Sequence, residues 1–306
     1  EMCIRDSGQG SQYPGMGWEL SQEYPRAAET FQEADEALGF SLSQMCFEGP
    51  KEELTLTQNT QPALLCVSVA VYRVLTDAGL SPDYVAGHSL GEYSALVAAG
   101  ALGFTDALRL VRKRGQFMQE AVPVGTGAMA AIIGLDLAAV DALCQDVAQG
   151  QVVSPANENA TDQVAIAGHA AAVERACELA LSRGAKRAIP LPVSAPFHCS
   201  LMEPAQRQMI PQLEAVEFKD LRFPMVNNVD AKLVTDGNEA RDGLIRQIPS
   251  TVRWAASILR LLEEDVDSFV EVGAGRVLTG LIRRLARGAS LASIEKPEQV
   301  EAYVQA

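Results

Sequence analysis

The chain has 306 residues, of which 48% are hydrophobic and 21% charged, a composition typical of a globular protein with a buried core. Its formal net charge of −14 argues against non-specific nucleic-acid binding, which needs a positive surface. The chain has no apolar run long enough to span a membrane, its first residues lack the apolar segment of a secretory signal, and its six cysteines have no Cys-x-x-Cys spacing, so we expect a reduced, cytoplasmic protein.

Strand and helix patterns alternate along most of the chain, which indicates an α/β architecture. The apolar run 84–87 predicts a strand, and the small residues over 90–99 predict a helix that ends at Gly100. Residues 105–121 have the pattern of an amphipathic helix. Further on, 269–272 predicts a buried strand and 277–287 a helix.

The middle of the chain has a pattern of its own. Strands are expected over 128–133, 151–155, 163–167 and 185–193, with helices over 137–147 and 170–182. This order, βαββαβ, is that of a ferredoxin-like unit. We therefore predict a large α/β-hydrolase-like domain, residues 1–123 and 195–306, interrupted by a small ferredoxin-like domain, residues 124–194. A ligand site is expected in the cleft that the two would share.

A Gly-His-Ser-Leu-Gly motif occupies residues 87–91, between the predicted strand and the predicted helix. In that context G-x-S-x-G is a nucleophile elbow: the glycines allow a sharp turn that exposes the Ser89 hydroxyl. The helix N-terminus behind it, with the Leu90 N–H, can stabilise an oxyanion. The alternative is a serine that merely caps a helix. The strand and helix on either side favour the nucleophile.

A serine nucleophile needs a base, and the chain has three histidines. His88 adjoins the serine, so the two side chains diverge, and His169 begins a helix of the inserted unit. His198 lies in a loop just after that unit and is the predicted base by elimination, with a backbone-bonded loop histidine as the alternative. In α/β-hydrolases the histidine comes late in the chain, whereas several elements follow His198 here, which indicates a different kind of serine enzyme.

Arg114 falls in the middle of the apolar face of the predicted helix 105–121. An unpaired buried charge costs several kcal/mol, so the guanidinium needs a partner. That partner is either an internal Asp or Glu or a ligand carboxylate held by two parallel hydrogen bonds. Together with Ser89, Arg114 favours a substrate with a free carboxylate.

The chain resembles the malonyl-CoA:acyl carrier protein transacylases of fatty acid synthesis from Gly8 to about Arg287. The matching segments are Gly8-Gln9-Gly10-Ser11-Gln12, Thr60-Gln61-Pro62-Ala63, Ala86 to Tyr93, Arg114-Gly115 with Met118-Gln119, Gly127 to Ala130, Pro192 to His198, Asn227-Asn228-Val229, and Glu271-Val272-Gly273 with Leu278 to Leu281. Any one of them alone would be weak, and together they are specific.

The resemblance implies a ping-pong transfer in which Ser89 attacks malonyl-CoA, His198 takes its proton, and an acyl carrier protein then accepts the malonyl group. Arg114 would hold the malonyl carboxylate. The other implied positions are Gln9 and the Leu90 N–H at the oxyanion, Gln247 with a main-chain carbonyl that orients the histidine, Phe197 as a mark of malonyl selectivity, Met118 in the substrate site, and His88 in support.

One segment departs from the family, which begins with an apolar strand leading into Pro-Gly-Gln-Gly. Residues 1–7 (Glu-Met-Cys-Ile-Arg-Asp-Ser) show no strand pattern, so we expect the sheet to lose a central strand that would also aim Gln9.

The sequence leaves other functions open. A discrete acyltransferase of a polyketide synthase would use the same chemistry, a thioesterase or esterase would pass the acyl group to water, and a carrier-binding scaffold would lack turnover. Lys186, Arg187, Arg283, Arg284 and Arg287 form a candidate carrier-docking patch. No residues have metal-ligand spacing. We expect a monomer without cofactor, coenzyme A entering as the thioester substrate, and no nucleic-acid or membrane partner.

Overall fold

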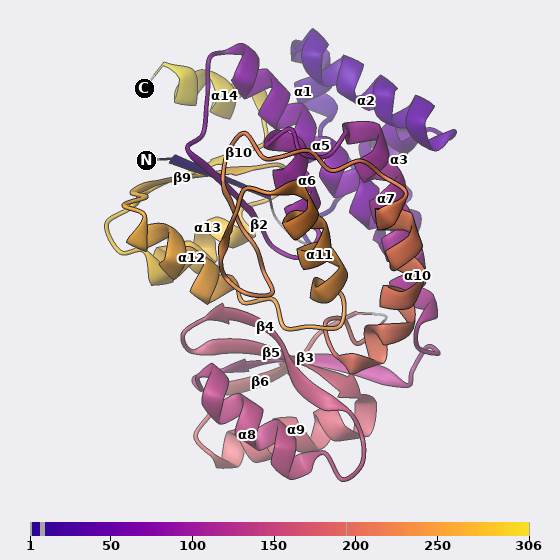
Figure 1. Ribbon diagram of the computed structural model, residues 1–306, viewed down its shortest axis with the longest axis vertical. Helices are drawn as coiled ribbons and strands as arrows, with labels where there is room; N and C mark the ends of the chain where they lie inside the picture. Colours follow the sequence, from indigo (N-terminus) through magenta and orange to yellow (C-terminus); the bar gives the residue numbers. More distant parts are fainter. Residues whose placement is uncertain (1, 7–9, 194, 306) are drawn as a thin grey trace.

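The computed structural model of the chain describes residues 2–6, 10–193 and 195–305, which form a mixed α/β protein (Figure 1). Within these residues the main sheet has six strands in the spatial order β10-β9-β1-β2-β7-β8. All neighbouring pairs are parallel except β7 and β8. The strands are β1 (Met2–Asp6), β2 (Tyr84–Gly87), β7 (Met225–Val226), β8 (Leu233–Val234), β9 (Ser268–Val272) and β10 (Ser290–Ile294).

The strand β1 corrects one expectation from the sequence. Residues 1–7 were expected to form no strand, yet Met2–Asp6 pairs in parallel with β2 on one side and β9 on the other. The prediction was wrong because strand propensity depends on context: two flanking strands that offer free backbone groups can outweigh a weak local pattern. The sheet therefore keeps its central strand. Gln9 lies outside the described residues.

Successive residues of a strand point to opposite faces of the sheet. Phe269 and Val270 of β9 accordingly belong to different hydrophobic clusters, as do Val85 and Ala86 of β2. One cluster contains α12 (Trp254–Glu263) and α13 (Val277–Leu285). The larger one contains α5 (Thr57–Asp77), whose residues are almost all buried. The main sheet is thus covered on both faces, as a buried parallel sheet requires.

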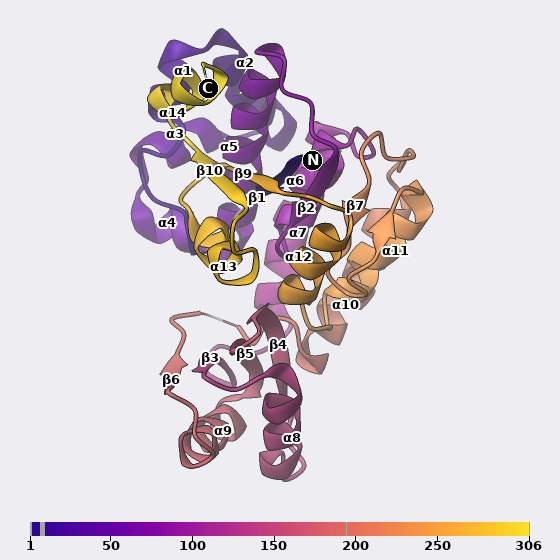
Figure 2. The same ribbon diagram turned by 90° about the vertical axis from the view of Figure 1, so that its left-hand side faces the viewer.

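The remaining helices outside the segment 127–190 pack in the larger cluster and around the main sheet (Figure 2). They are α1 (Trp18–Glu23), α2 (Pro25–Leu38), α3 (Leu42–Glu48), α4 (Lys51–Thr55), α6 (Gly91–Ala98), α7 (Phe104–Glu120), the short 3₁₀ helix Ser200–Met202, α10 (Glu203–Glu214), α11 (Gly237–Gln247) and α14 (Pro297–Val304).

A second, antiparallel sheet lies at the lower end of the molecule in Figures 1 and 2, with the order β4-β5-β3-β6. Its elements follow in the order β3 (Gly127–Ile133), α8 (Leu137–Val147), β4 (Val153–Ala160), β5 (Gln163–His169), α9 (Ala170–Ser182) and β6 (Arg187–Pro190). The two helices cover the face that is turned away from the rest of the molecule.

The small sheet also separates two clusters. Ala130 and Ile132 of β3 pack with α8 and α9, whereas Met129 belongs to the large cluster on the opposite face. The edge strand β4 is joined to the large part of the chain: the Glu158 N–H donates to the Val252 carbonyl at 2.9 Å, and the Val252 N–H donates to the Ala156 carbonyl at 2.9 Å. The small sheet therefore presents Met129 toward the carboxyl end of β2.

Candidate active site

Ser89 stands in the sharp turn between β2 and α6, with a left-handed backbone φ of 54°. A side chain at Gly87 is impossible here, because its Cβ would lie 1.9 Å from the Gly91 carbonyl. The turn is therefore as tight as an elbow needs to be, and α6 begins directly behind the serine. Among hydrogen bonds between described residues, none uses the Leu90 N–H, which leaves that donor available at the helix N-terminus.

His198 reaches the serine from the loop that follows the small sheet. Its Nε2 lies 2.6 Å from Ser89 Oγ, and its Nδ1 lies 3.1 Å from the main-chain carbonyl oxygen of Gln247, the last residue of α11. A carbonyl can only accept, so Nδ1 carries the hydrogen and Nε2 presents its lone pair to the serine hydroxyl. This tautomer is the one that a general base needs.

The imidazole of His198 is neutral at ordinary pH. Burial, together with the nearby positive charge of Arg114, lowers the pKa of His198 to about 3, although the hydrogen bond to the Gln247 carbonyl acts in the opposite direction. The neutral form is the one that can accept a proton, so His198 has the protonation state that a general base needs.

Arg114 lies on α7, and only 1% of its surface is exposed, as the helical pattern predicts. The neighbouring Gly115 lets α7 approach α5 closely, since a Cβ there would lie 2.5 Å from the Thr57 carbonyl oxygen. This approach brings the guanidinium to the serine: Nη2 donates to Ser89 Oγ at 3.0 Å, and Nη1 donates to Gln61 Oε1 at 2.9 Å. Nη2 also donates to Gln247 Oε1 at 3.0 Å, and all three partners are neutral.

Within the described part of the chain, Arg114 makes no ion pair, and its buried Nε has no hydrogen-bond partner. The sequence left two possible partners for Arg114, and the first of them, an internal Asp or Glu, is therefore not bonded to it. Burial lowers the pKa of Arg114, and Tyr93 and Glu92 act in the opposite direction. A positively charged group with unused hydrogen-bonding capacity thus stands beside the serine hydroxyl.

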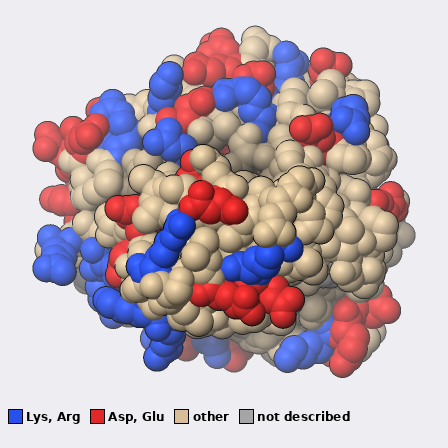
Figure 3. Space-filling view, turned by 90° about the horizontal axis from the view of Figure 1, so that it is seen from below, with Lys and Arg blue, Asp and Glu red and all other residues tan. Residues whose placement is uncertain are grey.

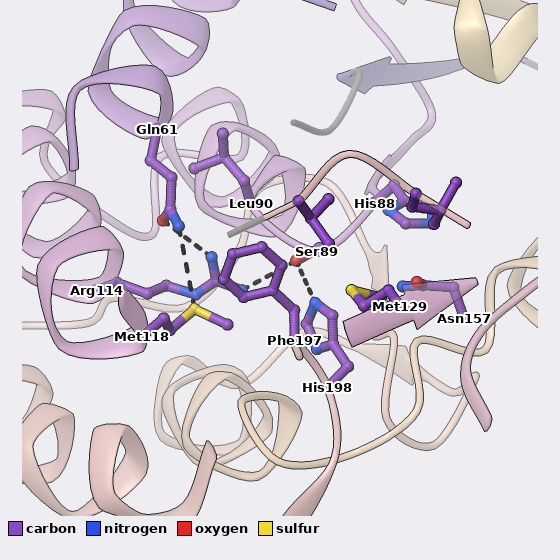
Figure 4. A pocket seen from close by; sticks show the side chains of 12 residues that line it. Gln61, His88, Ser89, Leu90, Arg114, Met118, Met129, Asn157, Phe197 and His198 are labelled. Atoms are coloured by element: carbon purple, nitrogen blue, oxygen red, sulfur yellow. Dashed lines mark hydrogen bonds between the residues drawn. The ribbon is translucent and has the colours of Figure 1, made fainter. Parts of the chain in front are cut away.

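A cavity of about 150 Å³ opens at these groups (Figure 4). Its lining residues come from both parts of the chain: Gln61, His88, Ser89, Leu90, Arg114, Met118, Met129, Asn157, Leu191, Val193, Phe197 and His198. In Figure 4, Arg114 and His198 point to Ser89 from different sides, while Phe197 and Met118 stand beside the guanidinium. The cavity is mostly apolar, with its polar groups gathered at the serine, as small-molecule sites are.

His88 turns away from the serine toward the small sheet. Its Nε2 lies 2.9 Å from Asn159 Oδ1 of β4, and its ring lies 5.6 Å from that of Trp254. Burial lowers the pKa of His88. His169, the third histidine, accepts the Val152 N–H at Nδ1 and is not among the residues that line the cavity.

Sequence reasoning did not assign several residues that the structure brings to this place. Gln61 was part of a matching segment, and its position among the apolar residues of α5 was a usable signal. Asn157 lines the cavity from β4, and Asn228 accepts the Ser89 N–H at 2.6 Å. Asn228, like Gln61, belongs to a matching segment, whereas Asn157 has no local pattern that distinguishes it from other strand residues.

The described residues hold no group of three or more His, Cys, Asp or Glu side chains placed to bind a metal ion. Every helix described is too short or too polar for a membrane span.

Comparison with known proteins identifies the class. A family model described as acyl transferase domain matches residues 6–298. The fold and this match together define an acyltransferase.

The relatives narrow the class further. The malonyl CoA-acyl carrier protein transacylases of Escherichia coli K12 and Bacillus subtilis are each 50% identical to this chain over 299 residues, covering 97% of it and 97% and 94% of their own lengths. The solved structure of the Coxiella burnetii transacylase has a TM-score of 0.97 at 44% identity, covering 100% of this chain and 97% of that one. A malonyl-transacylase in complex with a type II PKS acyl-carrier protein also has a TM-score of 0.97, at 47% identity, covering 100% and 99%. The chain belongs to the malonyl-CoA:acyl carrier protein transacylase family.

Proposed function

We propose that this protein transfers a malonyl group from malonyl-CoA to the phosphopantetheine thiol of an acyl carrier protein, through a malonyl ester on Ser89, and so supplies fatty acid elongation. The observation that carries the proposal is Arg114: a buried guanidinium without an ion pair among the described residues, 3.0 Å from Ser89 Oγ. A substrate whose acyl group ends in a carboxylate supplies the missing partner while its thioester carbon lies at the serine.

The reaction follows from the hydrogen bonds. As Ser89 Oγ attacks the thioester carbonyl, its proton passes to His198 Nε2, whose ring is held by the Gln247 carbonyl. The Leu90 N–H, with Gln9, stabilises the oxyanion. The C–S bond then breaks, and the proton passes from His198 to the sulfur of coenzyme A. The second half runs in reverse: the carrier thiol gives its proton to His198, attacks the malonyl ester, and Ser89 leaves with the proton.

The other residues shape the binding site. Phe197 and Met118 form the apolar wall beside the guanidinium, and His88 supports the elbow through Asn159. We also propose that the chain consists of an α/β-hydrolase-like domain, residues 1–123 and 195–306, and an inserted ferredoxin-like domain, residues 124–194. The βαββαβ order and the antiparallel arrangement β4-β5-β3-β6 support that division.

A mass measurement tests the acyl-enzyme. Incubation with malonyl-CoA in the absence of a carrier should add one malonyl group to the peptide that contains Ser89, and the Ser89→Ala variant should remain unmodified. Adding holo-carrier protein should then remove the group and malonylate the carrier. An unmodified Ser89 peptide in the wild-type protein would sink the proposal.

The complex with a type II PKS acyl-carrier protein, known for a similar transacylase, supports one alternative, a polyketide synthase partner. Comparing carrier proteins of both pathways as acceptors separates the two functions. Rapid release of free malonate without any carrier would instead indicate a thioesterase.

The candidate docking patch draws its residues from the start of β6 and from α13 with the segment directly after it. All five of its residues are exposed. The small sheet contacts α13 where Arg284 pairs with Asp162, in the turn between β4 and β5. Lys186 belongs to the same sheet, since its N–H donates to the Ile133 carbonyl at 2.7 Å. Figure 3, which views the molecule from the side of the small sheet, shows Lys and Arg side chains gathered at the lower left. An acidic carrier protein would be attracted to such a surface even though the whole chain is negative.

Charge reversal tests the patch. Because Arg284 is already paired with Asp162, we choose Arg283 and Arg287, which make no ion pair with a described residue. Arg283→Glu with Arg287→Glu should raise the KM for the carrier severalfold and leave the KM for malonyl-CoA unchanged, in steady-state assays at low salt. Reversal of Arg183, a basic residue directly after α9 that pairs with Asp146, serves as the control. An unchanged carrier KM would reject the patch.

The expectations of a monomer, of a cytoplasmic location, and of no cofactor, nucleic acid or membrane partner stay predictions.

A further inference from the structure

A buried carboxyl group lies beneath the elbow and takes no part in the reaction above. Glu92 stands on α6, three residues after the serine, and only 1% of its surface is exposed. It makes no ion pair with a described residue. Burial raises the pKa of Glu92, while the Asn228 N–H, the Gln247 amide and the charge of Arg114 act in the opposite direction and favour the carboxylate. A group that costs this much to bury needs a reason to be there.

Both oxygens of Glu92 accept hydrogen bonds from residues that in turn hold the elbow. Oε1 accepts the Asn228 N–H at 2.7 Å, and Oε2 accepts Gln247 Nε2. The Asn228 side chain binds both sides of the turn, since its Oδ1 accepts the Ser89 N–H at 2.6 Å and its Nδ2 donates to the Gly87 carbonyl at 2.7 Å. Glu92 thus connects three separate chain segments at the nucleophile.

The amide of Gln247 can face only one way in this arrangement. Its Nε2 is surrounded by acceptors, namely Glu92 Oε2, the Ser89 carbonyl oxygen at 2.9 Å and Asn228 Oδ1 at 3.3 Å. The amide oxygen Oε1 must therefore point the other way, where it accepts Arg114 Nη2 at 3.0 Å. Both oxygens of Glu92 accept from N–H donors, an arrangement that fits the carboxylate form, and a carboxylate binds the Gln247 amide more strongly than the two neutral acceptors do.

We infer that Glu92 is a positioning residue, which acts through the Gln247 amide to aim the Arg114 guanidinium at the carboxylate of the bound acyl group. The inference rests on the proposed function. Arg114 reaches Glu92 only through Gln247, so its charge is held in place without being neutralised by a direct ion pair and stays available to the substrate. In a direct ion pair, Glu92 would neutralise the Arg114 guanidinium, and a substrate carboxylate would find no free positive charge to bind.

The variant Glu92→Gln tests this because it keeps the shape and changes one acceptor into a donor. The oxygen of the new amide can accept from only one of the two donors, the Asn228 N–H or the Gln247 NH₂ group. Its own NH₂ group then faces the other donor, which is unfavourable. Relief comes from a flip of the Gln247 amide, which would turn its NH₂ group toward Arg114. We expect the ratio of malonyl to acetyl transfer, each as kcat/KM, to fall by about tenfold to a hundredfold.

Glu271 provides a matched control for a purely structural carboxylate. Its side chain is equally buried and accepts the Leu278 and Thr279 N–H groups at 2.9 and 2.7 Å, at the start of α13. Glu271→Gln should lower the melting temperature and leave the malonyl-to-acetyl ratio unchanged. A folded Glu92→Gln variant with an unchanged ratio would overturn the inference, and so would a variant that fails to fold, since the carboxyl would then be structural.

A double-mutant cycle tests the route through Gln247. Gln247→Met removes the amide but leaves the main-chain carbonyl that binds His198, and it should lower the same ratio. If Glu92 acts through this amide, adding Glu92→Gln to Gln247→Met should not lower the malonyl-to-acetyl ratio any further. Additive losses would contradict the route. Absence of malonyl-Ser89 in the wild-type protein would instead refute the proposed function, so the two failures are distinguishable.

Discussion

Replacing His198 by alanine should lower the rate at which malonyl-CoA acylates Ser89 by roughly 10²–10⁴-fold. Among the described residues, the imidazole is the one group bonded to Ser89 Oγ that can accept its proton, at 2.6 Å, and its other nitrogen binds a main-chain carbonyl and not a carboxylate. Rapid-quench measurement of the acyl-enzyme, with the mass of the Ser89 peptide as the readout, gives the rate directly.

His169→Ala is the control for this experiment, because the His169 ring binds the Val152 N–H and does not line the cavity. It should leave the acylation rate within about twofold of the wild-type value. A His198→Ala variant that acylates at the wild-type rate would show that another group takes the proton from Ser89.

Replacing Arg114 by alanine should reduce malonyl transfer far more than acetyl transfer, by a difference of roughly 10²–10³-fold in kcat/KM. The size follows from the loss of a buried, charge-assisted hydrogen-bonded pair, which costs about 2–5 kcal/mol when one partner is removed. Acyl-enzyme formation from malonyl-CoA and from acetyl-CoA is measured side by side. Arg109→Ala, an exposed arginine of the same helix, should leave the ratio unchanged.

The pH profile offers a second readout of the same variant. In the wild-type protein the acid limb of kcat/KM should lie well below pH 6.5, the ordinary histidine value, because the pKa of His198 is lowered and the neutral ring is the active form. Arg114 contributes to that lowering, so its removal should move the acid limb of acetyl transfer to higher pH. If malonyl and acetyl transfer fall equally and the acid limb does not move, Arg114 neither binds the acyl carboxylate nor lowers the pKa of His198.

The parts of the fold that the sequence predicted correctly are those with strong local patterns. The helices 137–147 and 170–182 occur with the predicted bounds, and the strand and helix around Ser89 lie within a residue or two of the prediction. Arg114 could be singled out because a charge on the apolar stripe of a helix violates the helix's own periodicity.

The parts that the sequence could not supply depend on contacts between distant segments. The strand β1 has a weak local pattern and gains its structure from β2 and β9. Asn228 and Glu92 are ordinary polar residues in a turn and a helix until the fold brings them together beneath the elbow. Such pairings have no signature within a single segment, so only the assembled structure reveals them.

The bridge between β4 and Val252 has a consequence for movement of the cavity walls. Asn157 and Asn159 stand on the bridged strand, which is thereby bonded to the segment that follows Gln247, and the Gln247 carbonyl binds His198. Leu191 follows β6, at the far edge of the small sheet, and its N–H donates instead to the Met129 carbonyl of β3 at 2.9 Å. The wall that carries the asparagines is therefore fixed in register with Ser89 and His198 by direct bonds, whereas the wall after β6 is held only through the small sheet.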